Sequence, residues 1–203
     1  MTQFEHNAKH NHMRQRLAQL AARLIAEDGM LDYSTAKRKA ARQLGAPDTQ
    51  NLPANGEIER ELRAYQALYQ KDEQAERLHT LRTDALDMMR QLQAFNPYLT
   101  GSVLSGTAAR GANINLQLFA NSLKDVELFL LKQKIAYETA EKRFRFGDEI
   151  RMVPVLILEG EHAEIELAVF SVDDLRQVPR SPVSGKAMER AKSQQVETLL
   201  EIT

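Results

Sequence analysis

The 203-residue chain contains no cysteine, so disulfide bonds and thiolate metal sites are excluded and the redox compartment stays open. It also lacks an apolar run near the roughly 20 residues that a membrane-spanning helix needs. The N-terminus, Met1 to His12, is polar and has no apolar signal segment. These absences favour a soluble, cytoplasmic protein without a membrane partner.

The charge of the chain is nearly balanced, with a formal net charge of -1. This argues against a nucleic-acid-binding protein that acts through bulk electrostatics, although a local basic patch is compatible with it. With 43% hydrophobic residues, the chain can bury a core and form one or two domains.

The first half of the sequence has helical periodicity. Apolar residues recur at helical spacing from Met13, and Gly29 is a natural stop. A second helix is expected from Asp32 or Ser34, either of which can cap it. A helical stretch from about residue 57 to 95 lacks proline and glycine, and a bend within residues 70–76 would divide it into two helices.

After Pro97 the pattern changes to a period of two, because Ile114, Leu116 and Leu118 alternate with polar residues. The pattern predicts strands at 137–146, 151–158 and 164–170, a helix at 123–134 capped by Ser122, a helical turn at 173–177 and a closing helix at 186–202. We therefore expect an α+β protein, with a helical region at residues 10–95 and an α/β domain with a mixed sheet and a C-terminal helix at residues 96–203.

One segment of the second half suggests chemistry. Gly101-Ser102 follows a short predicted strand, and such a pair can begin a helix whose free N–H groups face an anion. About ten residues later, Asn113-Ile114-Asn115-Leu116 alternates polar and apolar residues. A Gly-x-x-x-x-Gly spacing from Gly101 to Gly106 has no lysine after it and is therefore no P-loop.

This order resembles the signature of the nucleotidyltransferases of the DNA polymerase beta superfamily, over roughly residues 98–170. The resemblance implies transfer of a nucleotidyl group from a nucleoside triphosphate to an acceptor, which would be RNA, protein or a small molecule. Gly101 and Ser102 would hold the triphosphate. Asn113 and Asn115 occupy the positions of two Mg²⁺-binding carboxylates, and Glu166 is the expected third ligand, with Glu164 as the alternative.

The two asparagines depart from the family pattern. Asparagine has the shape of aspartate without its charge, and Mg²⁺ sites depend on anionic oxygen. The metal and catalytic positions Asn113, Asn115 and Glu166 therefore predict a degenerate Mg²⁺ site with weak or no activity. The alternative is that both asparagines face solvent on a half-buried strand.

Other charged residues have competing interpretations. Arg180 and Lys186 flank a loop containing proline and glycine and would meet a triphosphate if that loop covers the Gly-Ser turn; otherwise they solvate the surface. A basic cluster at residues 37–42 is a solvated helix face or a contact for a phosphate backbone. His6 and His10 are four residues apart, the spacing of a helical metal site, but they lie in a polar terminus.

Three functions are compatible with these features. The first is a nucleotidyltransferase. The second is a catalytically degenerate relative that binds a nucleotide or a macromolecule in a regulatory or interaction role. The third is a structural protein whose helical half mediates assembly.

Overall fold

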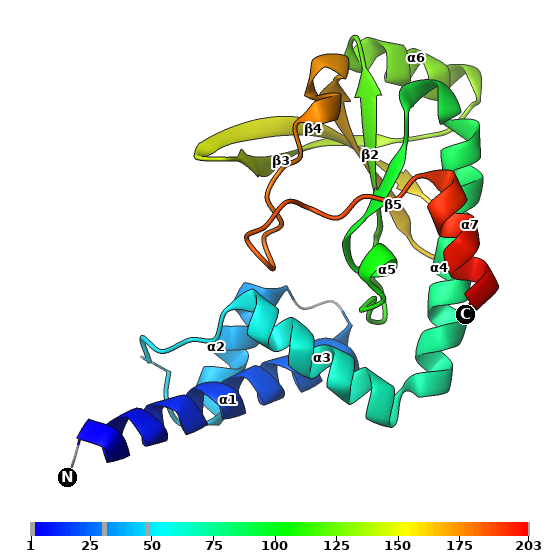
Figure 1. The fold of residues 1–203 in the computed structure, drawn as a ribbon. Coiled ribbons are helices and arrows are strands. Elements are labelled where there is room, and N and C mark those ends of the chain that lie inside the picture. The colour runs from blue at the N-terminus through cyan, green and yellow to red at the C-terminus, as the bar shows by residue number, and fades with distance from the viewer. Residues whose placement is uncertain (1–2, 30–31, 48, 203) are drawn as a thin grey trace. The chain divides into compact units, whose positions relative to one another are not determined.

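The computed structural model describes residues 3–29, 32–47 and 49–202 (Figure 1). The chain forms two compact units. The helical unit comprises the chain up to Gln74 together with residues 109–111 and 182–184, and the sheet unit comprises the remainder. The sheet unit thus begins at Ala75, ahead of the boundary at residue 96 that we expected from the sequence. The α+β fold class is confirmed.

The described part of the helical unit is built mainly from α1 (Gln3–Asp28), α2 (Tyr33–Gln43) and α3 (Asn55–Tyr69). The predicted cap of the second helix is confirmed, because an Asp32 side-chain oxygen accepts a hydrogen bond from the Thr35 backbone N–H at 2.8 Å. The helices enclose a core of small and aliphatic side chains, namely Leu17, Ala18, Ala21, Ala22, Ile25, Ala26, Ala36, Ala40, Ala41, Ile58, Leu62 and Ala109.

The first helix, α1, begins at Gln3, ahead of the apolar periodicity that starts at Met13. Residues 3–12 contain neither proline nor glycine, so nothing in them interrupts a helix. Their sequence also lacks an apolar stripe, and among the described side chains of α1 the fully buried positions begin at Leu17. Hydrophobic periodicity detects the part of a helix that carries an apolar stripe and misses a polar extension of the same helix.

An ion pair joins α1 to α3 within this unit. The Arg14 guanidinium donates to both carboxylate oxygens of Glu57, at 2.6 to 3.1 Å, and also to the Asn51 side chain at 3.1 Å. Glu57 in turn accepts the Ala54 backbone N–H at 2.6 Å, at the start of α3. Hydrogen bonding from Arg14 lowers the pKa of Glu57 from 4.5 to about 2.

We expect Glu57→Gln to destabilise the helical unit by about 1 kcal/mol at neutral pH, since it removes a partly exposed ion pair and weakens the cap of α3. The depressed pKa means that the contribution of Glu57 is present above about pH 4.5 and is lost as the pH falls toward 2. Chemical denaturation across this range measures it. The difference between wild type and variant should shrink toward pH 2, and Glu61→Gln, one turn along α3, is the matched control for the loss of a carboxylate.

The predicted bend within residues 70–76 is confirmed: the helical stretch divides into α3 and α4 (Lys71–Gln91) at Gln70. From Ala75 onward α4 belongs to the sheet unit, because its side chains Leu78, Leu81, Ala85 and Met89 pack into the core of that unit. The short helical turn η1 (Gln93–Phe95) then leads into the sheet.

The described residues of the sheet unit form one five-stranded sheet in the order β1-β2-β5-β4-β3. The strands are β1 (Tyr98–Thr100), β2 (Ile114–Ala120), β3 (Glu138–Phe146), β4 (Glu149–Glu159) and β5 (Glu164–Ser171). Strands β2 and β5 run parallel, and the other described neighbours are antiparallel. The mixed sheet and the three later strands predicted from the alternation are confirmed.

One face of the sheet is covered by helices. The alternating apolar residues Leu116, Leu118, Leu156 and Leu167 lie in a core with α4, α6 (Leu123–Lys132) and α7 (Ser193–Ile202) (Figure 1). The predicted cap of α6 is confirmed, since Ser122 Oγ accepts the Asp125 backbone N–H at 3.3 Å.

The opposite face, which we call the open face, is divided into two parts. A smaller apolar cluster occupies one part and contains Phe119, Phe146, Val153, Val155, Ala168 and Phe170. At the other end the positions of the same alternation are polar, with Asn115 on β2 opposite Glu166 on β5. The open face therefore changes from apolar to polar along the parallel strand pair.

The predicted closing helix from Lys186 is wrong in its first part, because α7 begins only at Ser193. Residues before it are extended, and Ala191 exchanges backbone hydrogen bonds of 2.9 and 3.0 Å with Leu99 of β1. The Gln195 side chain accepts the Lys192 backbone N–H at 2.8 Å at the start of the helix. Pairing with the sheet edge thus replaces the first turns of the expected helix.

Candidate functional site

The Gly101-Ser102 pair lies where β1 ends and the short helix α5 (Gly101–Ser105) begins. Gly101 has a φ of +75°, in the left-handed region that favours glycine. A Cβ atom at this position would lie 3.4 Å from Asn115 Nδ2 and 3.6 Å from Asn115 Cβ. Glycine therefore allows the turn to pack directly against the second asparagine of the motif.

The structure brings Asn113, Asn115 and Glu166 together. Asn115 is the register partner of Glu166 on the adjacent parallel strand. Asn113 precedes β2, and its Nδ2 donates to Glu166 Oε1 at 3.0 Å and to Glu164 Oε2 at 3.2 Å. These four residues define the polar site. Asn115 and Glu166 thus lie on neighbouring strands beside the Gly101-Ser102 turn, as expected, whereas Asn113 lies just before β2 and not on a strand.

A lysine that the sequence did not point to completes the polar site. The Lys142 ammonium, from β3, forms an ion pair with Glu166 across β4. Glu166 is only 9% exposed, so its charge is compensated inside the protein by Lys142 and by the Asn113 amide. Asn115 Nδ2 donates to the Asn113 backbone carbonyl at 3.0 Å. A protein cation thus already contacts the carboxylate that was expected to bind Mg²⁺.

The polar positions of β2 on the open face continue from Asn115 to a buried glutamine, Gln117. Gln117 follows Asn115 on the same face of β2, is 1% exposed, and donates from Nε2 to Met188 Sδ at 3.2 Å. Its Oε1 atom is buried and has no hydrogen-bond partner among the described residues. Gln117 therefore extends the polar side chains of the open face beneath a segment from the C-terminal part of the chain.

That segment, residues 178–181 and 185–191, is here called the strap. It is bonded to β3 through the Arg180 backbone N–H, which donates to the Arg145 carbonyl at 2.6 Å, and to β1 through Ala191. These two strands are opposite edges of the sheet, so the strap crosses the open face (Figure 1). The Arg190 guanidinium lies over the Tyr98 ring at 4.9 Å and fixes the strap beside β1.

The two predicted triphosphate-binding cations lie at the β3 side of the strap. Arg180 Nη1 donates to the Gly185 carbonyl at 3.2 Å, and the Lys186 carbonyl accepts the Ser181 N–H at 2.8 Å. These contacts join parts of the strap to each other. The structure thus places Arg180 by the edge of the sheet opposite the strand that leads into Gly101.

Other basic and histidine residues are arranged as follows. In the basic cluster of α2, Lys39 pairs with Asp28 at 3.1 Å, and Arg38 donates to the Thr35 hydroxyl at 3.3 Å. The side chains of His6 and His10 lie outside the described residues.

None of the described helices is long and apolar enough to cross a membrane.

A cavity of about 320 Å³ lies in the helical unit and is lined by α1 and α3 residues, including Arg14, Glu57 and Arg60. Its central charges, Arg14 and Glu57, are already paired with each other. The cavity is therefore a weaker candidate for a functional site than the polar site on the open face.

No protein-family model, curated protein or solved structure matches the chain.

Proposed function

We propose that the chain is a nucleotidyltransferase-like protein of the polymerase-beta type that binds a nucleoside triphosphate at the polar site and has lost most or all of its transfer activity. One observation carries the proposal. The Gly101 backbone packs against Asn115, which is directly opposite Glu166 on a parallel neighbour strand. This is the arrangement that the resemblance requires of the phosphate turn and two metal positions.

The chemistry of the turn favours a phosphate ligand. The N–H groups at the beginning of a helix lack partners within that helix and are suited to an anion. Because α5 has only five residues, its dipole is small, and binding must come from individual N–H groups and from nearby cations. Arg180 and Lys186 are the cations proposed for this role, which requires the strap to move.

The charges of the site favour the degenerate form over an active enzyme. Two-metal transfer needs carboxylates that hold and align two divalent ions. Here two of the three positions are neutral amides, and Lys142 neutralises the third. A lysine can screen a phosphate charge, but it cannot provide the coordination geometry of Mg²⁺. We therefore assign a binding and regulatory role, with Mg²⁺ contributing little to affinity.

Calorimetric titration with the four nucleoside triphosphates, with and without Mg²⁺, tests this assignment. We expect binding that depends only weakly on Mg²⁺. Ser102→Phe should weaken it by at least roughly tenfold, or about 1.4 kcal/mol, because the bulky ring blocks access to the turn.

Ser34→Phe is the matched control, because Ser34 is exposed and is the second residue of α2, as Ser102 is of α5. It should leave triphosphate binding unchanged. Absence of binding to every triphosphate by the folded wild-type chain would contradict the proposal and favour a structural or interaction role.

A further inference from the structure

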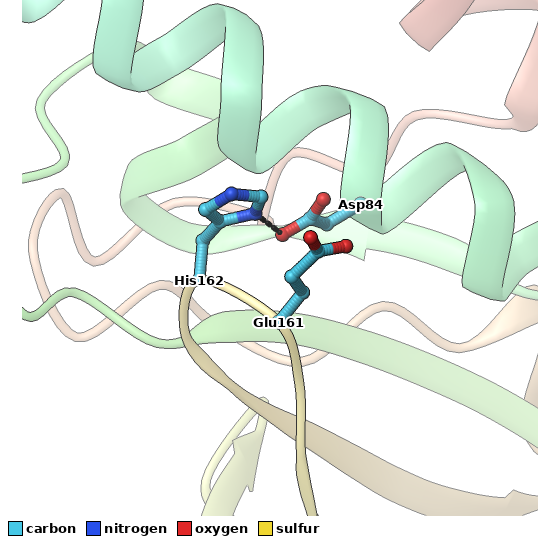
Figure 2. A group of neighbouring side chains, drawn as sticks. All are labelled: Asp84, Glu161 and His162. Carbon is cyan, nitrogen blue, oxygen red and sulfur yellow. Dashed lines mark hydrogen bonds and ion pairs between the residues drawn. The ribbon is translucent and has the colours of Figure 1, made fainter.

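A second group of potential metal ligands lies on the helix-covered side of the sheet unit. Asp84 is on α4, and Glu161 and His162 are in the turn between β4 and β5 (Figure 2). One ligand atom from each residue lies within 4.8 Å of the other two. The His162 Nδ1 atom is 2.9 Å from Asp84 Oδ2. We call these three residues the Asp-Glu-His cluster.

Both segments that carry the cluster are fixed by the fold. Asp84 is followed by Ala85, which is fully buried in the core of the sheet unit. The turn with Glu161 and His162 is closed by the pairing of Glu159 with Glu164. The Asp84 side chain is only 16% exposed, whereas that of His162 is 48% exposed. The cluster therefore has one anchored carboxylate and two ligands that are accessible from solvent.

The charges of the cluster are unbalanced. Two carboxylates lie side by side, and the described residues provide no lysine or arginine salt bridge to either of them. The His162 ring is the only described basic partner of Asp84, and Figure 2 shows the Glu161 carboxylate directed toward the Asp84 carboxylate. Like charges at this separation repel each other, and a divalent cation between them would remove the repulsion.

We propose that the Asp-Glu-His cluster binds a divalent transition-metal ion, of which Zn²⁺ is the representative. His162 would supply a ring nitrogen, and Asp84 and Glu161 would each supply one carboxylate oxygen. Metal–ligand bonds of about 2.1 Å at a tetrahedral angle place ligand atoms about 3.4 Å apart. The ligand atoms of the cluster all lie within 4.8 Å of one another, and His162 Nδ1 is 2.9 Å from Asp84 Oδ2, so their separations are close to this spacing.

The donor atoms determine which ion fits. An imidazole nitrogen suits Zn²⁺, Ni²⁺ or Cu²⁺, whereas Mg²⁺ and Ca²⁺ prefer oxygen ligands. Three protein ligands leave a position for water or an external ligand, as in open zinc sites. This site is separate from the polar site, because α4 covers one face of the sheet and Asn115 and Glu166 lie on the other.

The test is a titration of the metal-free full chain with Zn²⁺, with the three N-terminal histidines His6, His10 and His12 changed to asparagine to remove competing imidazoles. We expect one Zn²⁺ to bind and Mg²⁺ not to compete at equal concentration. Each of Asp84→Asn, Glu161→Gln and His162→Asn should weaken binding at least roughly tenfold. Zn²⁺ should also shift the ring nitrogen resonances of His162 in NMR spectra.

Two substitutions on α4 serve as matched controls. His79→Asn removes an exposed imidazole, and Asp87→Asn removes an exposed carboxylate, in each case outside the cluster. Both should leave Zn²⁺ affinity unchanged. Failure of Zn²⁺ to bind, or binding that His162→Asn and Glu161→Gln do not weaken, would overturn the proposal and leave His162 and Asp84 as a hydrogen-bonded pair only. Triphosphate binding is measured separately, so either proposal can fail without the other.

Discussion

The double variant Asn113→Asp, Asn115→Asp is expected to bind Mg²⁺ at least roughly 100-fold more tightly than the wild-type chain. Each substitution adds one unit of negative charge without changing the shape of the side chain, and a net gain of about 1.4 kcal/mol for each carboxylate is tenfold in affinity. The gain is limited by Lys142, whose ammonium already pairs with Glu166. Adding Lys142→Met should therefore increase Mg²⁺ affinity further.

The same variant should make stability depend on Mg²⁺. In the wild type, Asn113 donates to both Glu164 and Glu166, and Asn115 donates to the Asn113 carbonyl. Aspartate at either position replaces a donor by a second acceptor, so the metal-free variant contains facing carboxylates. We expect its melting temperature to fall without Mg²⁺ and to recover when Mg²⁺ binds the folded state.

Calorimetry and thermal melting with and without Mg²⁺ measure these effects, and transfer of radiolabel from a panel of triphosphates measures activity. The control variant Asn121→Asp, Gln133→Glu adds the same charge at exposed positions of the sheet unit, and it should change neither property. Robust Mg²⁺-dependent transfer by the wild-type chain would show that the catalytic carboxylates are misplaced, and Glu164, Glu166 and Asp148 would then be examined.

The sheet could be predicted from the sequence because its strands alternate strongly. Leu116, Leu118 and Leu167 point into the core beneath the helices, while Asn115 and Glu166 point to the open face. This period of two is a local property, so it is visible without knowledge of the strand order. The same alternation predicts which polar residues share a face of the sheet. Because β2 and β5 are neighbouring strands, Asn115 and Glu166 then lie side by side on that face.

The parts that could not be predicted depend on contacts distant in sequence. Residues 186–192 have a composition compatible with helix, but hydrogen bonds between Ala191 and Leu99 hold the end of this segment against the sheet edge. Lys142 reaches Glu166 only because β4 lies between β3 and β5 in the sheet. Asp84 is 77 residues before Glu161 in the chain (161 − 84 = 77), and no local spacing connects them.

Gly29→Ala is expected to have the largest effect on stability, at about 3 kcal/mol or more in the helical unit. Gly29 follows α1 with a φ of +76°, where a side chain costs about 1 kcal/mol. In addition, its Cβ would lie 2.2 Å from the Arg110 carbonyl oxygen and 2.7 Å from Arg110 Cβ. Because the nearest atom is backbone, rotation of a side chain cannot relieve the overlap, and the chain around residue 110 must move.

The variant Gly45→Ala separates the conformational cost of a positive φ from the cost of steric overlap. Gly45 has a similar φ of +70°, and beyond its two chain neighbours no described atom lies within 4 Å of the added Cβ, so this variant has only the conformational cost of about 1 kcal/mol. Chemical denaturation followed by hydrogen exchange of α1 and α3 amides compares the variants. Gly29→Ala should lose protection in these helices before the strands of the sheet unit, whose core is formed by other residues. Equal destabilisation by the two substitutions would mean that residues 109–111 do not pack against Gly29 in solution.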